Sequence, residues 1–206
     1  MGTTVVSQPV IEWGWAGRAF GAGDESGDLH VVLPLPNGAL LAVIDGLGHG
    51  PEARTAALEA SAVLSKDPAR PPLELIQRCH EALRKTRGAV MSVARIHAAD
   101  SSLEWCGVGN VEAILIRPDR AARGTESVVA RGGVVGYRLP TLKAARVALR
   151  PRDVLFMATD GIASDYSSDL SLEDAPQSLA NEILANYAKA SDDALVLVAR
   201  YLGANS

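Results

Sequence analysis

Two segments of the sequence share one pattern, and they constrain the fold more than any other feature. Residues 40–44 form an apolar run that ends at Asp45-Gly46, and residues 154–159 form a similar run that ends at Asp160-Gly161. An apolar run without alternation is typical of a strand buried on both faces. The glycine is expected to let the backbone turn sharply after the carboxylate. The sequence therefore predicts two buried strands that each end in an aspartate.

The remaining elements follow from proline, glycine and hydrophobic periodicity. Pro51 stands at the first position of a helix predicted over 52–66, and Pro71-Pro72 opens a second helix that closes before Gly88. A polar loop is predicted over 118–126 and a last helix over 172–189. Further strands are predicted over 10–20, 29–35, 89–97, 102–108, 111–117, 127–131, 146–149, 153–158 and 194–202. This order lacks a strict βαβ alternation and indicates an α+β fold with mainly antiparallel strands.

Composition and charge exclude several classes of protein. The chain has 206 residues, 48% of them hydrophobic, so we expect one domain over 1–206 with a sizeable core. The net charge of −4 and the lack of a basic stripe argue against nucleic acid as a partner. No apolar segment approaches the roughly 18 to 20 residues that cross a bilayer, so no membrane partner is expected.

The two cysteines and the N-terminus indicate a cellular compartment. Cys79 and Cys106 lie far apart and have no metal-ligand spacing, which favours reduced thiols over a disulfide or a zinc site. The first nine residues show no basic stretch followed by an apolar run. We therefore expect a cytoplasmic protein.

Four acidic positions have the same setting and suggest a metal site. Asp28 follows Ser26-Gly27, and Asp192-Asp193 immediately precedes the last predicted strand. If these strand ends converge with Asp45 and Asp160, the like charges cannot all stay ionised without a cation. Oxygen ligands favour magnesium or manganese over zinc, and two such ions could activate water and clamp a phosphoryl group. The alternative is that each Asp-Gly is an ordinary turn, which would be the better interpretation of any one of them alone.

The stretch from Asp45 to Gly50 admits a second interpretation. A buried strand, a glycine-rich turn and a helix start also describe a dinucleotide-binding loop. The spacing here is GxGxG instead of GxGxxG, an acidic residue occupies the strand end, and no second βαβ unit follows. We therefore disfavour the nucleotide site.

The ordered set of motifs is similar to that of the metal-dependent protein phosphatase (PPM) family, and of its SpoIIE/RsbU branch in particular. The resemblance covers nearly the whole chain, from residue 13 to residue 201. It rests on Ser26-Gly27-Asp28, Asp45-Gly46-Leu47-Gly48-His49-Gly50, Gly107-Val108-Gly109-Asn110, Ala158-Thr159-Asp160-Gly161 and Asp192-Asp193-Ala194-Leu195.

The resemblance implies an α-β-β-α sandwich, with two central antiparallel sheets flanked by helices and two manganese or magnesium ions at one edge. Asp45 would bridge the ions, and Gly46 would offer its backbone carbonyl to one of them. Asp160 and Asp192 would complete the ligand set, and Asp28 would be a ligand or lie just behind it. Asp45 and Asp160 would then act in catalysis through the ions and a bound water.

Two departures and the short chain refine the expected function. Leu195 stands where the family usually has threonine, and the arginine with which some members hold phosphate has no clear match. A bare domain of this length resembles the RsbX-type feedback phosphatases of the bacterial stressosome, whose substrates are phosphorylated STAS-domain proteins. We therefore expect a protein serine/threonine phosphatase of a stress-response pathway.

The alternative function is a catalytically silent module that keeps the fold in order to dock a STAS-type partner. Retention of four aspartates favours the enzyme, because buried carboxylates are costly without an ion. Two smaller questions stay open. His49 could be a turn residue or assist proton transfer, and residues 132–137 could be a connection or part of a docking surface. Trp13, Trp15 and Trp105 are expected to pack on strands.

Overall fold

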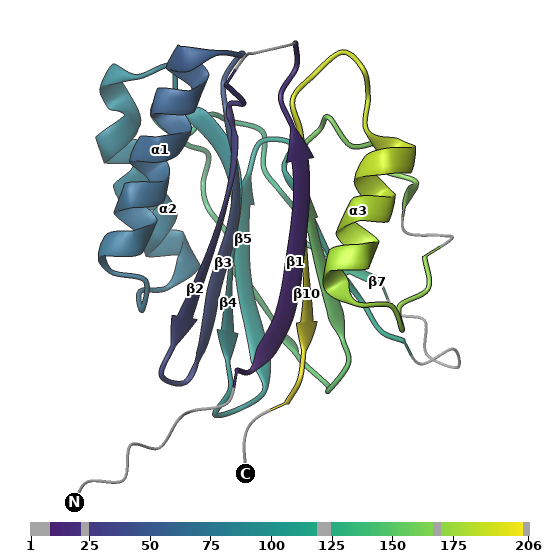
Figure 1. The fold of residues 1–206 in the computed structure, drawn as a ribbon. Helices are drawn as coiled ribbons and strands as arrows, with labels where there is room; N and C mark the ends of the chain where they lie inside the picture. Colours follow the sequence, from purple (N-terminus) through teal and green to yellow (C-terminus); the bar gives the residue numbers. More distant parts are fainter. Residues whose placement is uncertain (1–8, 22–24, 119–124, 167–169, 204–206) are drawn as a thin grey trace, which may run out of the picture.

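The computed structural model describes residues 9–21, 25–118, 125–166 and 170–203, and its centre is a pair of stacked five-stranded antiparallel sheets (Figure 1). In sheet order, the first contains β1 (Ile11–Arg18), β10 (Ala194–Tyr201), β9 (Val154–Ala158), β6 (Glu112–Ile116) and β7 (Thr125–Ser127). The second contains β2 (Asp28–Leu35), β3 (Gly38–Gly46), β4 (Ala89–His97), β5 (Ser102–Val108) and β8 (Ala145–Ala148).

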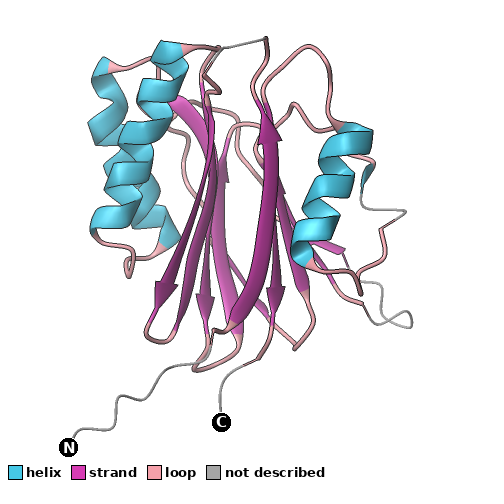
Figure 2. Cartoon of the chain, viewed as in Figure 1, coloured by secondary structure: helices cyan, strands magenta, loops and turns pink. Residues whose placement is uncertain are grey.

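Helices cover the outer face of each sheet (Figure 2). The helices α1 (Pro51–Lys66) and α2 (Pro72–Ala82), which a short 3-10 turn follows, pack on the second sheet. Helix α3 (Pro176–Tyr187) packs on the first. The predicted α-β-β-α sandwich is therefore confirmed. Among the described residues no helix is both long and apolar enough to cross a membrane.

Strand β3 shows why its sequence is apolar without alternation. Leu41 and Val43 face the other sheet, where they share a core with Trp105 and Leu197. The intervening residues of β3, among them Ile44, face α1 and α2. Both faces of the strand are therefore buried, as the sequence predicts, and its end at Asp45 is held firmly in place.

Each of the three helices α1, α2 and α3 begins at a proline. The sequence-based prediction used this signal for α1 and α2 but not for α3. Each helix has proline in its first turn, where the fixed φ suits the helix and the missing N–H has no intrahelical partner to lose. The prediction that the last helix begins at residue 172 is wrong. Pro176 disfavours the helical conformation at Ala175, whose ψ is 141°, so the helix begins at the proline.

The other strand boundaries agree with the predictions to within one or two residues, except in one place. The first strand, for example, ends at Arg18 instead of residue 20. The strand predicted over 127–131 instead occupies Thr125–Ser127, so the predicted loop 118–126 ends earlier, and residues 119–124 lie outside the described residues. Thr125 pairs with Ile116 at the end of β6, and this pairing outweighs the β propensity of the valines that follow.

Candidate metal centre

The predicted acidic positions come from four strand ends at one end of the sandwich. Asp28 begins β2 and lies opposite Asp45, which is near the end of β3. Asp160 follows β9, and Asp192 and Asp193 precede β10, which is antiparallel to β9. In each antiparallel pair one strand begins where its neighbour ends, so all of these residues reach the upper end in Figure 1.

The carboxylates at this end repel one another. Burial raises the pKa of Asp45 to about 8, and repulsion by Asp28, Asp160 and Asp192 acts in the same direction. The pKa of Asp28 is raised to about 7, chiefly by burial and also by repulsion from Asp193, Asp192 and Asp160, against the lowering effect of the hydrogen bond from Thr159. The pKa of Asp160 is raised by burial and by Asp192. The carboxylates at these strand ends are therefore electrostatically coupled to one another.

Protein donors hold two of these carboxylates but leave Asp45 free. Thr159 is 2% exposed; its hydroxyl donates to Asp28 Oδ2 at 2.8 Å and accepts the Leu195 N–H at 2.9 Å. The side-chain amide of Asn110 donates to Asp160 Oδ2 at 2.5 Å. Within the described part of the chain, no donor reaches the carboxylate of Asp45 and no basic side chain forms an ion pair with it. Its charge has no compensation from those residues.

The neighbouring acids Asp192 and Asp193 have different surroundings. Asp193 is 5% exposed and accepts the N–H groups of Phe20 at 2.6 Å and Gly27 at 2.7 Å, so it ties the end of β1 to the start of β2. Asp192 is exposed, and its Oδ1 accepts the N–H of Asp193 at 2.9 Å. Asp193 is thus committed to the backbone, and Asp192 remains the candidate ligand of the pair.

The glycines after Asp45 and Asp160 are required for close packing; the chain turns at Asp160-Gly161 as expected, whereas Gly46 is still part of β3. Neither Gly46 nor Gly161 has a positive φ. A Cβ on Gly46 would lie 2.1 Å from the carbonyl oxygen of Ala53 in α1, and one on Gly161 would lie 1.8 Å from the carbonyl oxygen of Asp193. The backbones therefore approach more closely than a side chain allows, which draws the strand ends together.

The donor set fits hard divalent ions by its chemistry. The candidates Asp28, Asp45, Asp160 and Asp192 and the Gly46 carbonyl offer only oxygen, which suits magnesium or manganese. A bound cation would relieve the repulsion that raises their pKa values. In the described residues no three acidic, histidine or cysteine side chains converge on a single point. Ligation therefore requires carboxylates to turn toward a shared position.

Three residues that support the site were not among the predicted site residues. Asn110 and Thr159 fix Asp160 and Asp28 as described above, and both lie inside motifs that the sequence displays. Lys189 donates from Nζ to the backbone carbonyl of Asp160 at 2.6 Å. It comes from the segment after α3, and no local sequence signal indicates the contact, because it depends on how the chain returns to the site.

The two features left open by the sequence lie outside the carboxylate cluster. His49 is exposed, and its ring meets Phe20 edge-on with centroids 6.2 Å apart. In the 132–137 segment, Val135 exchanges backbone hydrogen bonds with Ala89 of β4, and the Gly136 N–H donates to His80 Nδ1 at 3.0 Å. Most of this segment is therefore a packed connection.

The competing nucleotide site is excluded by the sheet topology. Strand β3, which leads into the glycine-rich turn, is antiparallel to both of its neighbours, β2 and β4. A dinucleotide-binding loop needs a βαβ unit with parallel strands. Here α1 leads to α2 and then to an antiparallel strand.

Comparisons with known proteins agree with this geometry. The family model described as Stage II sporulation protein E (SpoIIE) matches residues 36–202. The chain belongs to the SpoIIE family. The phosphoserine phosphatase RsbX of Bacillus subtilis (strain 168) is 32% identical over 79 residues, which are 38% of this chain and 40% of RsbX. The match thus spans less than half of that relative.

Solved structures extend the likeness over nearly the whole chain. A chain from a structure described as "The bacterial stressosome: a modular system that has been adapted to control secondary messenger signaling" is 30% identical with a TM-score of 0.83. The match covers 92% of this chain and 99% of that one. RsbX in complex with magnesium matches with a TM-score of 0.83 at 21% identity, over 93% of this chain and 95% of RsbX.

The fold extends to more distant phosphatases. The serine/threonine phosphatase PstP/Ppp of Mycobacterium tuberculosis has a TM-score of 0.71 at 16% identity, over 94% of this chain and 99% of that one. The resemblance drawn from the motifs is therefore confirmed. This SpoIIE-family chain belongs to the SpoIIE/RsbU branch of the metal-dependent protein phosphatases and is RsbX-like.

Proposed function

We propose that this chain is a manganese- or magnesium-dependent protein serine/threonine phosphatase, acting on a phosphorylated STAS-domain regulator of a bacterial partner-switching pathway. The observation that carries the proposal is the set of mutually repelling carboxylates at four strand ends, in which Asp45 has no hydrogen-bond donor or ion-pair partner among the described residues. The RsbX structure with magnesium supports the choice of ion. The stressosome neighbour, at 30% identity, supports the choice of partner.

The residues of the site have distinct tasks in this proposal. When bound, the two ions would supply an activated water and neutralise the charge of the phosphoryl group. Asp45 would bridge them, and the Gly46 carbonyl, Asp160 and Asp192 would complete the ligands, with Asp28 beside them. Through their hydrogen bonds Asn110 and Thr159 fix the orientation of Asp160 and Asp28. A site held in this way loses little entropy when the substrate binds.

The proposal is tested by phosphate release from a phosphorylated STAS-domain protein with manganese, with magnesium and with a chelator. We expect release with either ion and none after chelation. Asp45→Asn removes a charge and nearly keeps the shape, so metal affinity should fall and the rate should drop below about a tenth, a loss of more than about 1.4 kcal/mol. Asp67→Asn, which alters an acid on the far end of α1 beside Arg70, is the matched control.

The rival function, a silent docking module, gives a different result in the same assay. Such a module would bind the phosphorylated protein but release no phosphate with any divalent ion. Full turnover in metal-stripped protein, or a normal rate in Asp45→Asn, would instead overturn the metal chemistry.

A further inference from the structure

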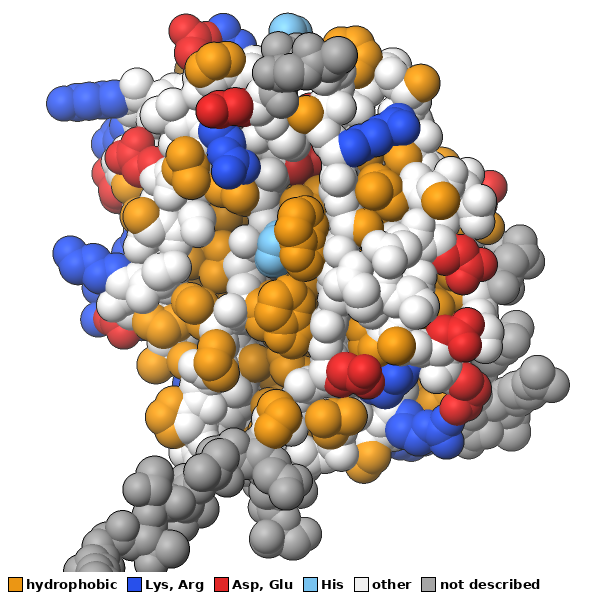
Figure 3. Space-filling view, in the orientation of Figure 1, with side chains coloured by type: hydrophobic (Ala, Val, Ile, Leu, Met, Phe, Trp, Pro, Cys, Tyr) orange, Lys and Arg blue, Asp and Glu red, His pale blue; other side chains and the backbone are white. Residues whose placement is uncertain are grey.

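The open side of the sandwich carries an exposed surface that the proposed chemistry does not use. The edge strands β1 and β2 face each other there, and Trp13 and Trp15 of β1 are 42% and 41% exposed. Their rings lie against His30 of β2, with centroids 6.0 and 4.3 Å from the imidazole. Figure 3 shows hydrophobic side chains gathered along this line. We call this surface the β1–β2 seam. It consists of Trp13, Trp15 and His30, together with an upper pocket at one end of these residues and a lower pocket at the other.

Trp13 and Trp15 thus pack on strands as expected, against His30 of β2, but unlike the buried Trp105 they keep about two-fifths of their surface exposed. The reason is that β1 is an edge strand, so its inward-facing residues near the edge meet solvent. Large exposed aromatic surface in a row is uncommon in monomers and is typical of an interaction site.

The upper pocket of the seam reaches Asp28, one of the candidate metal ligands. It has a volume of about 380 Å³, and its wall includes Asp28, Arg18 and Arg54. Arg18 donates to the backbone carbonyl of Lys189 at 2.6 Å, and Arg54 to that of Ser26 at 3.5 Å. Within the described ranges neither guanidinium forms an ion pair with a carboxylate. Two arginines without an ion pair to any described carboxylate therefore lie in the same wall as Asp28, and they complement an acidic ligand.

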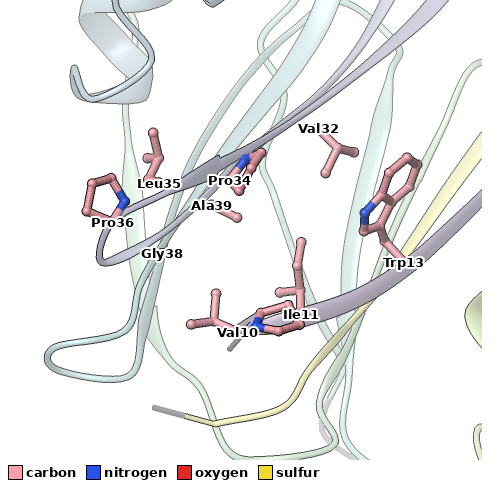
Figure 4. A pocket seen from close by; sticks show the side chains of 10 residues that line it. Val10, Ile11, Trp13, Val32, Pro34, Leu35, Pro36, Gly38 and Ala39 are labelled. Atoms are coloured by element: carbon pink, nitrogen blue, oxygen red, sulfur yellow. The ribbon is translucent and has the colours of Figure 1, made fainter. Parts of the chain in front are cut away.

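The lower pocket is an apolar groove of about 500 Å³ (Figure 4). Ile11 and Trp13 of β1 line one side, and Val32 and Leu35 of β2 line the other. Trp13 also contacts His30, which belongs to the wall of the upper pocket, so the two pockets follow one another along the seam. At about 3.3 Å per residue, β2 runs about 23 Å from Asp28 to Leu35, a length that one docked partner segment can span.

The backbone of this side is closed to an added strand. The Trp15 N–H donates to Gln177 Oε1 at 3.3 Å, and Gln177 Nε2 donates to the Trp15 carbonyl at 2.8 Å, so a side chain of α3 occupies the edge of β1. Pro34 gives β2 a position without an N–H. Both are devices that protect edge strands from pairing. The seam therefore offers side chains for recognition and disfavours edge pairing with a second copy.

We propose that the β1–β2 seam docks the phosphorylated partner protein beside the metal centre. Arg18 and Arg54 bind acidic side chains next to the phosphorylated residue, and an apolar side chain of the partner covers Trp13 and enters the groove. Tryptophan and arginine are the residue types most enriched at binding hot spots. The inference rests on the proposed function, because Asp28 is what joins the seam to the reacting phosphate.

Peptide binding is measured first. The Asp45→Asn variant is used because it should not remove the phosphate from the peptide during the measurement. The probes are two phosphothreonine peptides that share a leucine about seven residues from the phosphate, roughly 23 Å when extended, and differ in flanking glutamates or lysines. Tryptophan fluorescence reports binding, because two of the three tryptophans lie in the seam. The glutamate peptide should bind at least about tenfold tighter, a difference of about 1.4 kcal/mol.

Substitutions in the seam then show which residues cause the difference in peptide affinity. Arg18→Gln with Arg54→Gln should remove the preference for glutamate, and Trp13→Ala should weaken both peptides. The controls are Arg78→Gln, an exposed arginine on α2, and Leu58→Ala, a leucine on α1 that is 50% exposed; neither should change binding. Equal affinity for the two peptides, or a preference that survives in the arginine double variant, would overturn the proposal.

The proposed function can fail separately from the docking proposal. Hydrolysis of p-nitrophenyl phosphate with manganese should be unchanged in the Arg18→Gln/Arg54→Gln and Trp13→Ala variants, whereas kcat/KM for the glutamate peptide should fall at least about tenfold. If wild-type protein hydrolyses neither compound, the phosphatase proposal falls, and the binding data still decide the docking. A dimer that Trp13→Ala dissolves would assign the seam to a second copy and contradict the proposal.

Discussion

At the scale of single residues, Thr159 links the two halves of the site. Its hydroxyl reaches from the end of β9 to Asp28 on the other sheet and also accepts the N–H of Leu195. Leu195 stands where the family usually has threonine. In this chain the hydroxyl of Thr159, at the end of the neighbouring strand, accepts the backbone N–H of Leu195. One buried hydroxyl thus satisfies a carboxylate and a backbone donor together.

Replacing this hydroxyl should affect stability and metal binding. Thr159→Val keeps the shape but leaves the Leu195 N–H and Asp28 without their partner, so the free energy of unfolding should fall by about 1 to 3 kcal/mol. Manganese affinity should fall as well, since Asp28 loses its fixed orientation. Urea unfolding and calorimetric titration measure the two effects. Ser65→Ala, which removes an exposed hydroxyl on α1, should change neither.

At the scale of elements, the contact between β3 and α1 positions the strand end that carries Asp45. The start of α1 crosses so close to β3 that Gly46 lies against the carbonyl oxygen of Ala53. The helix thereby fixes where both Asp45 and the Gly46 carbonyl stand. A small shift of this helix would move two of the candidate ligands at once.

Gly46→Ala tests this contact. The new methyl group would lie 2.1 Å from the Ala53 oxygen, so helix and strand must separate, and the free energy of unfolding should fall by about 1 to 3 kcal/mol. Gly132→Ala is the matched control, because its Cβ would meet nothing within 4 Å. Denaturant unfolding of both variants gives the comparison. Equal stability of the two would mean that α1 yields easily and does not hold the site.

At the scale of the whole molecule, the carboxylate cluster couples folding to pH. The pKa of Asp45 rises from its ordinary 3.8 to about 8, and that of Asp28 rises to about 7. The folded chain therefore binds protons that the unfolded chain releases near pH 4. Proton binding by Asp45 and Asp28 therefore stabilises the folded state. This stabilisation is complete below pH 3.8 and is lost as the pH rises through about 7 to 8.

The metal-free protein should show this slope directly. Its stability should fall between pH 5 and 8 relative to that of Asp45→Asn, which lacks one of the titrating groups. Because the ions bind ionised carboxylates, manganese affinity should rise over the same interval, with release of protons. Thermal unfolding with chelator and calorimetry in two buffers measure these effects. A stability difference that does not vary with pH would contradict the raised pKa of Asp45.

Substrate choice also belongs to the whole molecule. The seam and the metal centre together offer more surface than a phosphate fills, and remote contacts can be used to orient the reacting group. We expect an intact phosphorylated STAS-domain protein to have a kcat/KM at least about a hundredfold above that of a short peptide with the same site, or about 2.7 kcal/mol. The two are compared at one manganese concentration. Equal values would indicate a broad phosphatase with its selectivity elsewhere.

The sequence by itself determined the elements and the acidic positions. Runs such as 40–44, and prolines such as Pro51, act through local periodicity and fixed dihedral angles, which are visible without the fold. The ordered motifs then indicated the family. Pro176 shows the limit of the sequence-based prediction, which began the last helix at Leu172, whereas the helix begins at the proline.

Only the tertiary structure decided the role of individual residues within the motifs. Asp193, and not Asp192, is fixed by two backbone N–H groups, and Gly46 is needed for the approach of α1 instead of a turn. The exposed stack of Trp15 on His30 depends on both strands lying at sheet edges. The contacts of Asp193 and the Trp15–His30 stack join residues far apart in the chain and exist only once the two sheets have stacked, and Gly46 meets Ala53 only once α1 has packed on β3.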